Sequence, residues 1–291
     1  MNNIVYKNSN ECTWIEKYSD STNKKKNYFS FCDAIFIITV KKNEITDKQL
    51  NMIKNIKKLG CKKQIYWCYT KGYKECNLKD HHENLKYNYK IIFEFCILKK
   101  FDNILILEDD LVITDKLWSN YKEKKKEILN VIKKNKNKCL IFYFGKLPFL
   151  SYPINKYISK GAFVQNHCVM YNKNSAKEFM RLYNNFLIES RLVDTFHLLN
   201  DTFKCYALTP NNIFFQLSDK KHIYETPCST INILLIYLQS LFTGRLYYNF
   251  DPKFAKYWEP YGFTYYTFLL LFKIIILIIY VFSIVIKKLK K

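Results

Sequence analysis

The sequence lacks the glycine-rich motifs with which many nucleotide-binding proteins hold phosphates. Neither GxGxxG nor a GxxxxGKS/T motif occurs, and the 291 residues include only six glycines. In these motifs, glycines allow backbone amides to approach a phosphate closely. If the protein binds a nucleotide, carboxylates and a metal ion must therefore hold its diphosphate.

Cysteine pairs with the spacing of a metal site are also missing. None of the ten cysteines belongs to a CxxC motif, and no His/Cys set has the spacing of zinc ligands. Cys96 and Cys139 lie in apolar runs, where cysteine behaves as a small hydrophobic residue. An even number of cysteines does not by itself make a disulfide framework in a chain of this length. The sequence therefore predicts free thiols, a reducing compartment and no zinc site.

A secretory signal is not evident, because residues 1–26 are polar. A hydrophobic content of 49% excludes a disordered chain. The formal net charge of +22 comes from lysines that are spread along the chain, together with the Asn, Ile, Tyr and Phe that an AT-rich coding sequence favours. We therefore expect a general preference for anionic partners, phosphates or acidic lipid, but no specific nucleic-acid partner.

The last part of the chain contains a long apolar run. Residues 268–286 are nearly all aliphatic or aromatic, with an interruption at Lys273 and a lysine-rich end after position 286. A run of this length can cross a bilayer as a helix, with Tyr265 and Tyr266 in the aromatic belt. A buried terminal core helix is the alternative. We expect membrane localisation through a single-pass C-terminal anchor, with the preceding domain in the cytosol.

Strands alternate with helices in the first half of the chain. Short apolar runs are separated by helical segments of ten residues or more, of which the first has a cap at Thr46 and an end at Gly60. This order predicts right-handed βαβ units and a mostly parallel central sheet flanked by helices. The predicted strands are 33–40, 64–69, 103–107 and 139–144, and the predicted helices are 46–59, 83–99 and 116–135.

The second half has a different pattern. Residues 145–164 contain Pro148 and Pro153 and are predicted to form a long irregular connection that shapes a site. A strand over 162–171 and a helix over 175–186, capped by Asn174, are expected to follow. The remaining predicted elements are helices at 193–200 and 231–242 and strands at 204–208 and 213–215.

Three carboxylates directly follow the predicted central strand. Glu108, Asp109 and Asp110 end an aliphatic run, so a buried parallel strand would deliver them to its carboxyl end, where open α/β sheets bind ligands. Adjacent carboxylates repel one another, and Mg²⁺ or Mn²⁺ would remove that repulsion. The pattern fits a metal site, although a solvated turn has the same appearance.

Two residues further along are candidates for the same site. His167 lies in an apolar run, where a neutral imidazole can bind a metal ion or a phosphate. Asp194 has apolar neighbours at the predicted start of a helix and can act as a general base. Each has a structural alternative, since a lone histidine often belongs to a core and an aspartate at this place can be a helix N-cap.

Taken in order, these features resemble glycosyltransferase family 25, which includes lipooligosaccharide and procollagen galactosyltransferases of the GT-A fold. The resemblance covers roughly residues 34–216. The family's early arginine-containing loop is absent, and Lys41 and Lys42 are the nearest substitutes. The segments that carry the resemblance are Ile-Leu-Glu-Asp-Asp-Leu at 106–111, His-Cys-Val-Met-Tyr-Asn at 167–172, Val193-Asp194, 207–210 and 215–216.

The resemblance implies an α/β, GT-A-like enzyme that transfers a hexose from a nucleoside-diphosphate sugar, most plausibly UDP-linked, to a hydroxyl of a glycan, protein or lipid acceptor. It implies that Asp110 and His167 bind Mn²⁺ or Mg²⁺. Glu108 and Asp109 would contact the nucleotide sugar, and Asp194 would be the base for the acceptor hydroxyl.

This interpretation divides the chain into four parts. They are a loose N-terminal arm at 1–27, a GT-A-like glycosyltransferase domain at 28–220, a helical and aromatic membrane-proximal segment at 221–263, and a transmembrane helix with a basic tail at 264–291. A catalytically inactive, membrane-anchored protein of the same fold is the first alternative. A basic nucleic-acid-binding protein is the second.

Overall fold

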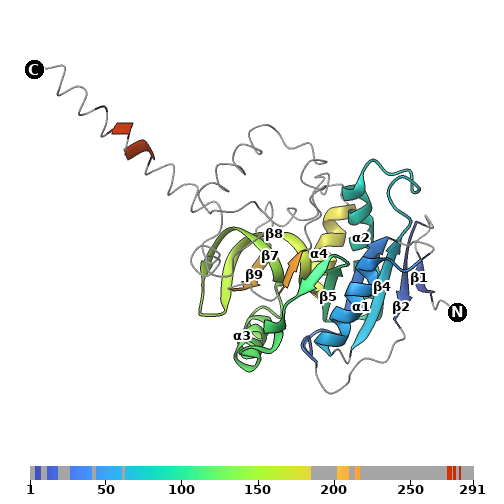
Figure 1. Cartoon of the computed structure of the whole chain (residues 1–291), viewed down its shortest axis with the longest axis horizontal. Coiled ribbons are helices and arrows are strands. Elements are labelled where there is room, and N and C mark those ends of the chain that lie inside the picture. The colour runs from blue at the N-terminus through green and yellow to red at the C-terminus, as the bar shows by residue number, and fades with distance from the viewer. Residues whose placement is uncertain are drawn as a thin grey trace, which may run out of the picture.

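The computed structural model describes most of the first 184 residues and parts of the remainder. The described residues form a large mixed sheet, a small two-stranded sheet and helices that pack on them (Figure 1). The described ranges are 4–7, 12–18, 27–40, 44–60, 63–184, 202–209, 214–216 and six positions between 274 and 282.

The large sheet has eight strands in the order β1-β2-β4-β3-β5-β8-β7-β9. The small sheet pairs β6 (Leu111–Ile113) with β10 (Phe214–Gln216). In the order of the large sheet, the strands are β1 (Ile4–Lys7), β2 (Thr13–Lys17), β4 (Gln64–Thr70), β3 (Ala34–Val40), β5 (Asn103–Glu108), β8 (Ile158–Asn172), β7 (Cys139–Pro153) and β9 (Phe203–Leu208).

Two consecutive βαβ connections build the centre of the large sheet. Helix α1 (Asp47–Leu59) joins β3 to β4, and helix α2 (His81–Lys99) joins β4 to β5, which lies on the other side of β3. Both β4 and β5 pair with β3 in parallel. Because the two neighbours lie on opposite sides of β3, the carboxyl ends of β3 and β5 form a topological switch point.

Helices α1 and α2 pack on opposite faces of the sheet because side chains alternate along the central strands. Ile35 and Ile37 of β3 belong to the buried cluster that contains Met52 of α1. Phe36 belongs to the cluster that contains Phe93 of α2. Strand β3 is buried on both faces, which is typical of a strand with a helix layer on each side.

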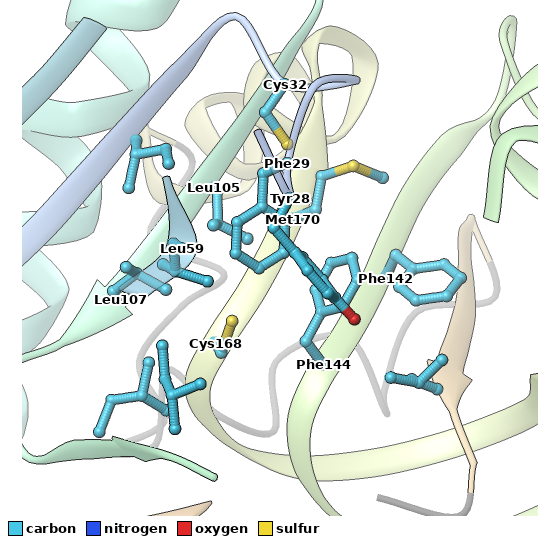
Figure 2. Close-up of a cluster of buried hydrophobic side chains, with 14 of the residues drawn as sticks. Tyr28, Phe29, Cys32, Leu59, Leu105, Leu107, Phe142, Phe144, Cys168 and Met170 are labelled. Carbon is cyan, nitrogen blue, oxygen red and sulfur yellow. The ribbon is translucent and has the colours of Figure 1, made fainter. Parts of the chain in front are cut away.

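The cluster on the α1 side extends across the sheet to β7. Figure 2 shows Leu59 of α1 near Leu107 of β5, and the rings of Phe142 and Phe144 further along the sheet. Tyr28 is fully buried in this cluster, and its ring centroid lies 4.7 Å from that of Tyr121. Each such side chain contributes about 1.5–3 kcal/mol through burial. The aromatic contacts thereby hold α3 (Tyr121–Lys134) and the preceding 3₁₀ helix (Asp115–Trp118) against the sheet.

A long β-hairpin occupies the place where the sequence predicted an irregular connection. Strands β7 and β8 pair with each other, and the start of β8 also pairs with β9, so the hairpin curves strongly (Figure 1). The register shifts near Gly145 and Pro148 account for this curvature, since bulges bend the strand that contains them. The prediction of an irregular connection at 145–164 is therefore wrong. Helix α4 (Lys173–Asn184) follows and packs on α2 through the Phe93 and Phe179 rings.

The predicted GT-A-like fold with a mostly parallel sheet is wrong. Among the strands that the structure describes, six of nine pairings are antiparallel. The parallel pairings are β3 with β4, β3 with β5, and β7 with β9. The physical reason is that β8 returns from the β7–β8 hairpin and inserts beside β5 in the opposite direction, while β1 and β2 add antiparallel strands at the other edge.

The prediction of a C-terminal membrane anchor at 264–291 is also wrong. Within the part of the chain that the structure describes, no helix has both the length and the apolar character needed to cross a membrane. The described helical positions in this region are 274–276, 278–279 and 282. The membrane and transmembrane assignments, and the localisation derived from them, are withdrawn with the anchor.

One disulfide was not expected from the sequence. Cys12, just before β2, is bonded to Cys76 in the loop after β4, with a Cα–Cα distance of 5.7 Å. The prediction of free thiols is wrong for this pair. Within the described residues, Cys68, Cys96, Cys139, Cys168 and Cys205 are free thiols.

Candidate functional site

The acidic triplet lies at the switch point of the sheet. Strand β5 is buried along its four aliphatic residues and ends at Glu108, as the apolar run predicted. Asp109 and Asp110 form the turn between β5 and β6. The parallel register of β3 and β5 pairs Ile38 with Glu108, so the end of β3 lies beside the first carboxylate.

Asp109 is held by the last buried residue of β3. The Thr39 hydroxyl donates to Oδ2 of Asp109 over 2.5 Å, although the two residues are 70 positions apart in sequence. Burial raises the pKa of the Asp109 carboxyl group, and the charge of Glu108 acts in the same direction. The Thr39 hydrogen bond and the positive charge of Lys48 on α1 oppose this increase in pKa. Asp109 is thus a partly buried acid that accepts a hydroxyl hydrogen bond and is influenced by the positive charge of Lys48.

The first turn of α1 supports Thr39 from the other side. Thr46 caps the helix, and together with Gln49 it forms a complete capping box, which confirms the predicted cap. The Gln49 side chain also donates from Nε2 to the Thr39 hydroxyl and to the Val40 carbonyl oxygen, each over 3.3 Å. The end of β3 and the start of α1 are therefore joined through one buried amide.

Glu108 and His167 meet across β5 and β8. The antiparallel register pairs Leu107 with Cys168, so the next positions of the two strands face each other. Nδ1 of His167 lies 3.4 Å from Oε2 of Glu108, and His167 is only 4% exposed. A buried imidazole beside a carboxylate can be oriented by it for binding a metal ion or a phosphate.

The backbone that follows the triplet is fixed by side chains of α1. Asn51 and Asn55 both donate to the Leu111 carbonyl oxygen, over 3.2 and 2.7 Å. Lys58 donates to the Ile113 carbonyl oxygen over 3.0 Å. Strand β6 therefore pairs with β10 along one edge. Side chains of α1 donate hydrogen bonds to its carbonyl groups.

The donor set fits a hard divalent ion that takes few protein ligands. Among the residues that the structure describes, no three His, Cys, Asp or Glu side chains are grouped to hold a metal ion. Glu108, Asp110 and His167 therefore do not make a three-ligand cage. Mg²⁺ usually binds one or two carboxylates and takes its other ligands from water and substrate phosphates, so the carboxylates at this turn are compatible with it.

Some predicted residues fall outside the described structure. Asp194, the candidate base, and Lys41 and Lys42, the substitutes for the missing arginine loop, belong to this group. In contrast, Thr39, Lys48 and Gln49 are at the site and were not selected from the sequence. The capping-box spacing of Thr46 and Gln49 was the available signal for this turn, but it indicates a helix start and not a contact to Asp109.

Comparison with known proteins adds little at this point. No family model matches the chain, and no curated protein matches it. The crystal structure of A197 from STIV is a solved structure to which the chain is similar, with 12% identity and a TM-score of 0.38. The similarity covers 64% of this chain and 86% of A197. A similarity this low does not indicate a function for this chain.

Proposed function

We propose that this protein is a glycosyltransferase that transfers a hexose from a UDP-linked nucleoside-diphosphate sugar to an acceptor hydroxyl. The observation that carries the proposal is the Thr39–Asp109 hydrogen bond at the carboxyl ends of β3 and β5. Nucleotides bind at such switch points in open α/β sheets. A buried carboxylate kept in one orientation is suited to accept hydrogen bonds from the hydroxyl groups of a ribose or a sugar.

The charges around the switch point support a diphosphate as the bound group. Lys48 and the N-terminal turn of α1 lie on the Asp109 side, and a helix N-terminus and a lysine both favour negative charge. Since the sequence has no glycine-rich phosphate loop, these groups and a metal ion would take its role. The resemblance of the Glu108–Asp110 triplet to the metal motif of glycosyltransferase family 25 supports the same substrate class.

Each residue of the site has a separate task in the proposed reaction. Asp110 and His167 would hold Mn²⁺ or Mg²⁺, which when bound supplies a Lewis acid for the departing diphosphate. Glu108 and Asp109 would contact the ribose or donor sugar, and Glu108 would also orient His167 through the 3.4 Å contact. Asp194 would accept the proton of the acceptor hydroxyl as the sugar is transferred.

The proposal is tested by measuring UDP release by the full chain from a panel of UDP-hexoses, with Mn²⁺ and with EDTA. We expect Mn²⁺-dependent release, and a loss of about 100-fold in Asp110→Ala because charge stabilisation at the leaving group is lost. Asp102→Ala is the matched control, because Asp102 is an exposed carboxylate at the opposite end of β5. Turnover in Asp110→Ala equal to that of the wild type would refute the proposal.

Binding measurements with UDP-hexoses and with DNA or RNA, made beside the release assay, separate the alternatives. A catalytically inactive protein would bind a UDP-hexose without releasing UDP. A nucleic-acid-binding protein would bind DNA or RNA with a steep dependence on salt and would ignore the nucleotide sugars.

A further inference from the structure

The side chain of Gln49 connects three parts of the candidate site. It is 6% exposed, and its Oε1 atom accepts from the Thr46 backbone N–H over 3.0 Å. Its Nε2 atom donates to the Val40 carbonyl oxygen and to the Thr39 hydroxyl. These two backbone partners fix the orientation of the amide, because only the oxygen can accept from an N–H and only the nitrogen can donate to a carbonyl.

The fixed amide determines the direction of the Thr39 hydrogen bond. Since Nε2 of Gln49 can only donate, the Thr39 oxygen acts as the acceptor in that contact. The one hydroxyl hydrogen of Thr39 is then available to Asp109, whose Oδ2 lies 2.5 Å away. The result is a directed chain of hydrogen bonds from Gln49 through Thr39 to the carboxylate of Asp109.

We propose that Gln49 is a positioning residue, which orients the Asp109 carboxylate for the nucleotide sugar through the Thr39 hydroxyl. This inference rests on the proposed function and adds a residue that does not touch the donor. With Oδ2 engaged by Thr39, the carboxylate cannot rotate freely and is held in one orientation for a hydroxyl group of the donor. Preorganisation of this kind reduces the ordering cost of binding.

Gln49 also has a structural task, because it belongs to the capping box of α1. Two variants separate the tasks. Gln49→Glu keeps an acceptor for the Thr46 N–H, since Glu and Gln are the usual residues at this capping position. It cannot donate to Thr39 or to the Val40 carbonyl oxygen, and the introduced carboxylate would instead accept the Thr39 hydrogen. Thr46→Ala removes the cap hydroxyl and leaves the Gln49–Thr39–Asp109 chain intact.

The experiment measures the Kd of UDP-galactose by calorimetry in Mn²⁺, with circular dichroism as the check on the fold. We expect the Kd to rise about tenfold in Gln49→Glu, which corresponds to the loss of one hydrogen bond. Thr46→Ala should lower the melting temperature and raise the Kd by less than Gln49→Glu does, because the hydrogen bonds from Gln49 to Thr39 and from Thr39 to Asp109 remain. Thr39→Val should reproduce the loss of affinity, and Thr39→Ser, which keeps the hydroxyl, should bind like the wild type.

The double variant completes the test. If Gln49 acts through Thr39, then Gln49→Glu adds no further loss of affinity in the Thr39→Val background. An unchanged Kd in folded Gln49→Glu, or additive losses in the double variant, would overturn the positioning role while leaving the proposed function in place. Absence of UDP-galactose binding by the wild type, with no release from any UDP-hexose, would overturn the proposed function and the positioning role with it.

Discussion

At the scale of single residues, the site is marked by polar groups buried where a sheet is otherwise apolar. Thr39, Gln49 and His167 are each less than 7% exposed, and they converge on Glu108 and Asp109. Burial of a polar group is unfavourable unless it is hydrogen-bonded. Each of these groups has a hydrogen-bonding partner at the carboxyl ends of β3 and β5, which is where the proposed ligand would bind.

The free cysteines have a different character, and their reactivity can be predicted. Burial raises the pKa of Cys96 to about 12, with Asp33 acting in the same direction, and burial raises the pKa of Cys205 to about 12. The thiolate is the reactive form, so at pH 8 only on the order of 10⁻⁴ of each thiol is reactive. We expect iodoacetamide to modify both at least about 100-fold more slowly in the native protein than in denaturant. The rate in the native protein should rise about tenfold for each pH unit.

Mass spectrometry of timed samples gives the rate at each cysteine. Cys139 is only half-buried and serves as the internal comparison in the same digest. Equal rates for Cys96 in the native and denatured protein would show that the buried environment described for it is incorrect.

The sequence indicated part of the site but not its connections. Glu108, Asp109 and Asp110 could be selected because an aliphatic strand ends directly before them, and His167 because it interrupts an apolar run. Thr39 and Gln49 could not be selected in this way. Their roles depend on a hydrogen bond between residues 70 positions apart, and local spacing contains no information about such a contact.

At the scale of elements, α1 serves as the support of the site. Its first turn holds the end of β3, and its middle holds β6 through Asn51, Asn55 and Lys58. The helix was predicted with its cap and its end at Gly60, because both ends have local signals. The helix after β8 was predicted two residues too late. Asn172, rather than Asn174, accepts from the Ser175 N–H.

The contact between α1 and β6 predicts a stability effect. Asn55 is almost completely buried and donates to the Leu111 carbonyl oxygen over 2.7 Å. We expect Asn55→Ala to lower the free energy of unfolding by about 1–3 kcal/mol, because a buried hydrogen bond is lost. Lys54→Ala, at an exposed position of the same helix, should change it by less than about 0.5 kcal/mol. Urea denaturation measures both, and equal effects would contradict the supporting role of Asn55.

At the scale of the whole molecule, strand direction was the feature that the sequence could not supply. The strands predicted at 33–40, 64–69 and 103–107 correspond to β3, β4 and β5, which form the parallel centre of the sheet. The direction of β8 depends on the 15-residue β7, which was predicted as a six-residue strand followed by a loop. Once β7 and β8 form a hairpin, β8 must run antiparallel to β5.

The Cys12–Cys76 disulfide is a constraint on the whole molecule, because it connects residues 64 positions apart. Closing a loop of this length in the unfolded chain corresponds to about 4 kcal/mol of stabilisation in the chain-entropy model. We expect a reductant to lower the urea midpoint of the wild type clearly. The Cys12→Ser/Cys76→Ser variant should have a urea midpoint as low as that of the reduced wild type, whether or not reductant is present. A wild-type midpoint that does not respond to complete reduction would contradict this contribution.

The central claim is that a nucleotide diphosphate binds at the carboxyl ends of β3 and β5. It is tested most directly by a crystal structure of the full chain with UDP and Mn²⁺. The account predicts the ribose within hydrogen-bond distance of Asp109, with the diphosphate between Asp110 and the first turn of α1. UDP bound elsewhere on the protein, with Asp109 and Asp110 in contact only with solvent, would contradict it.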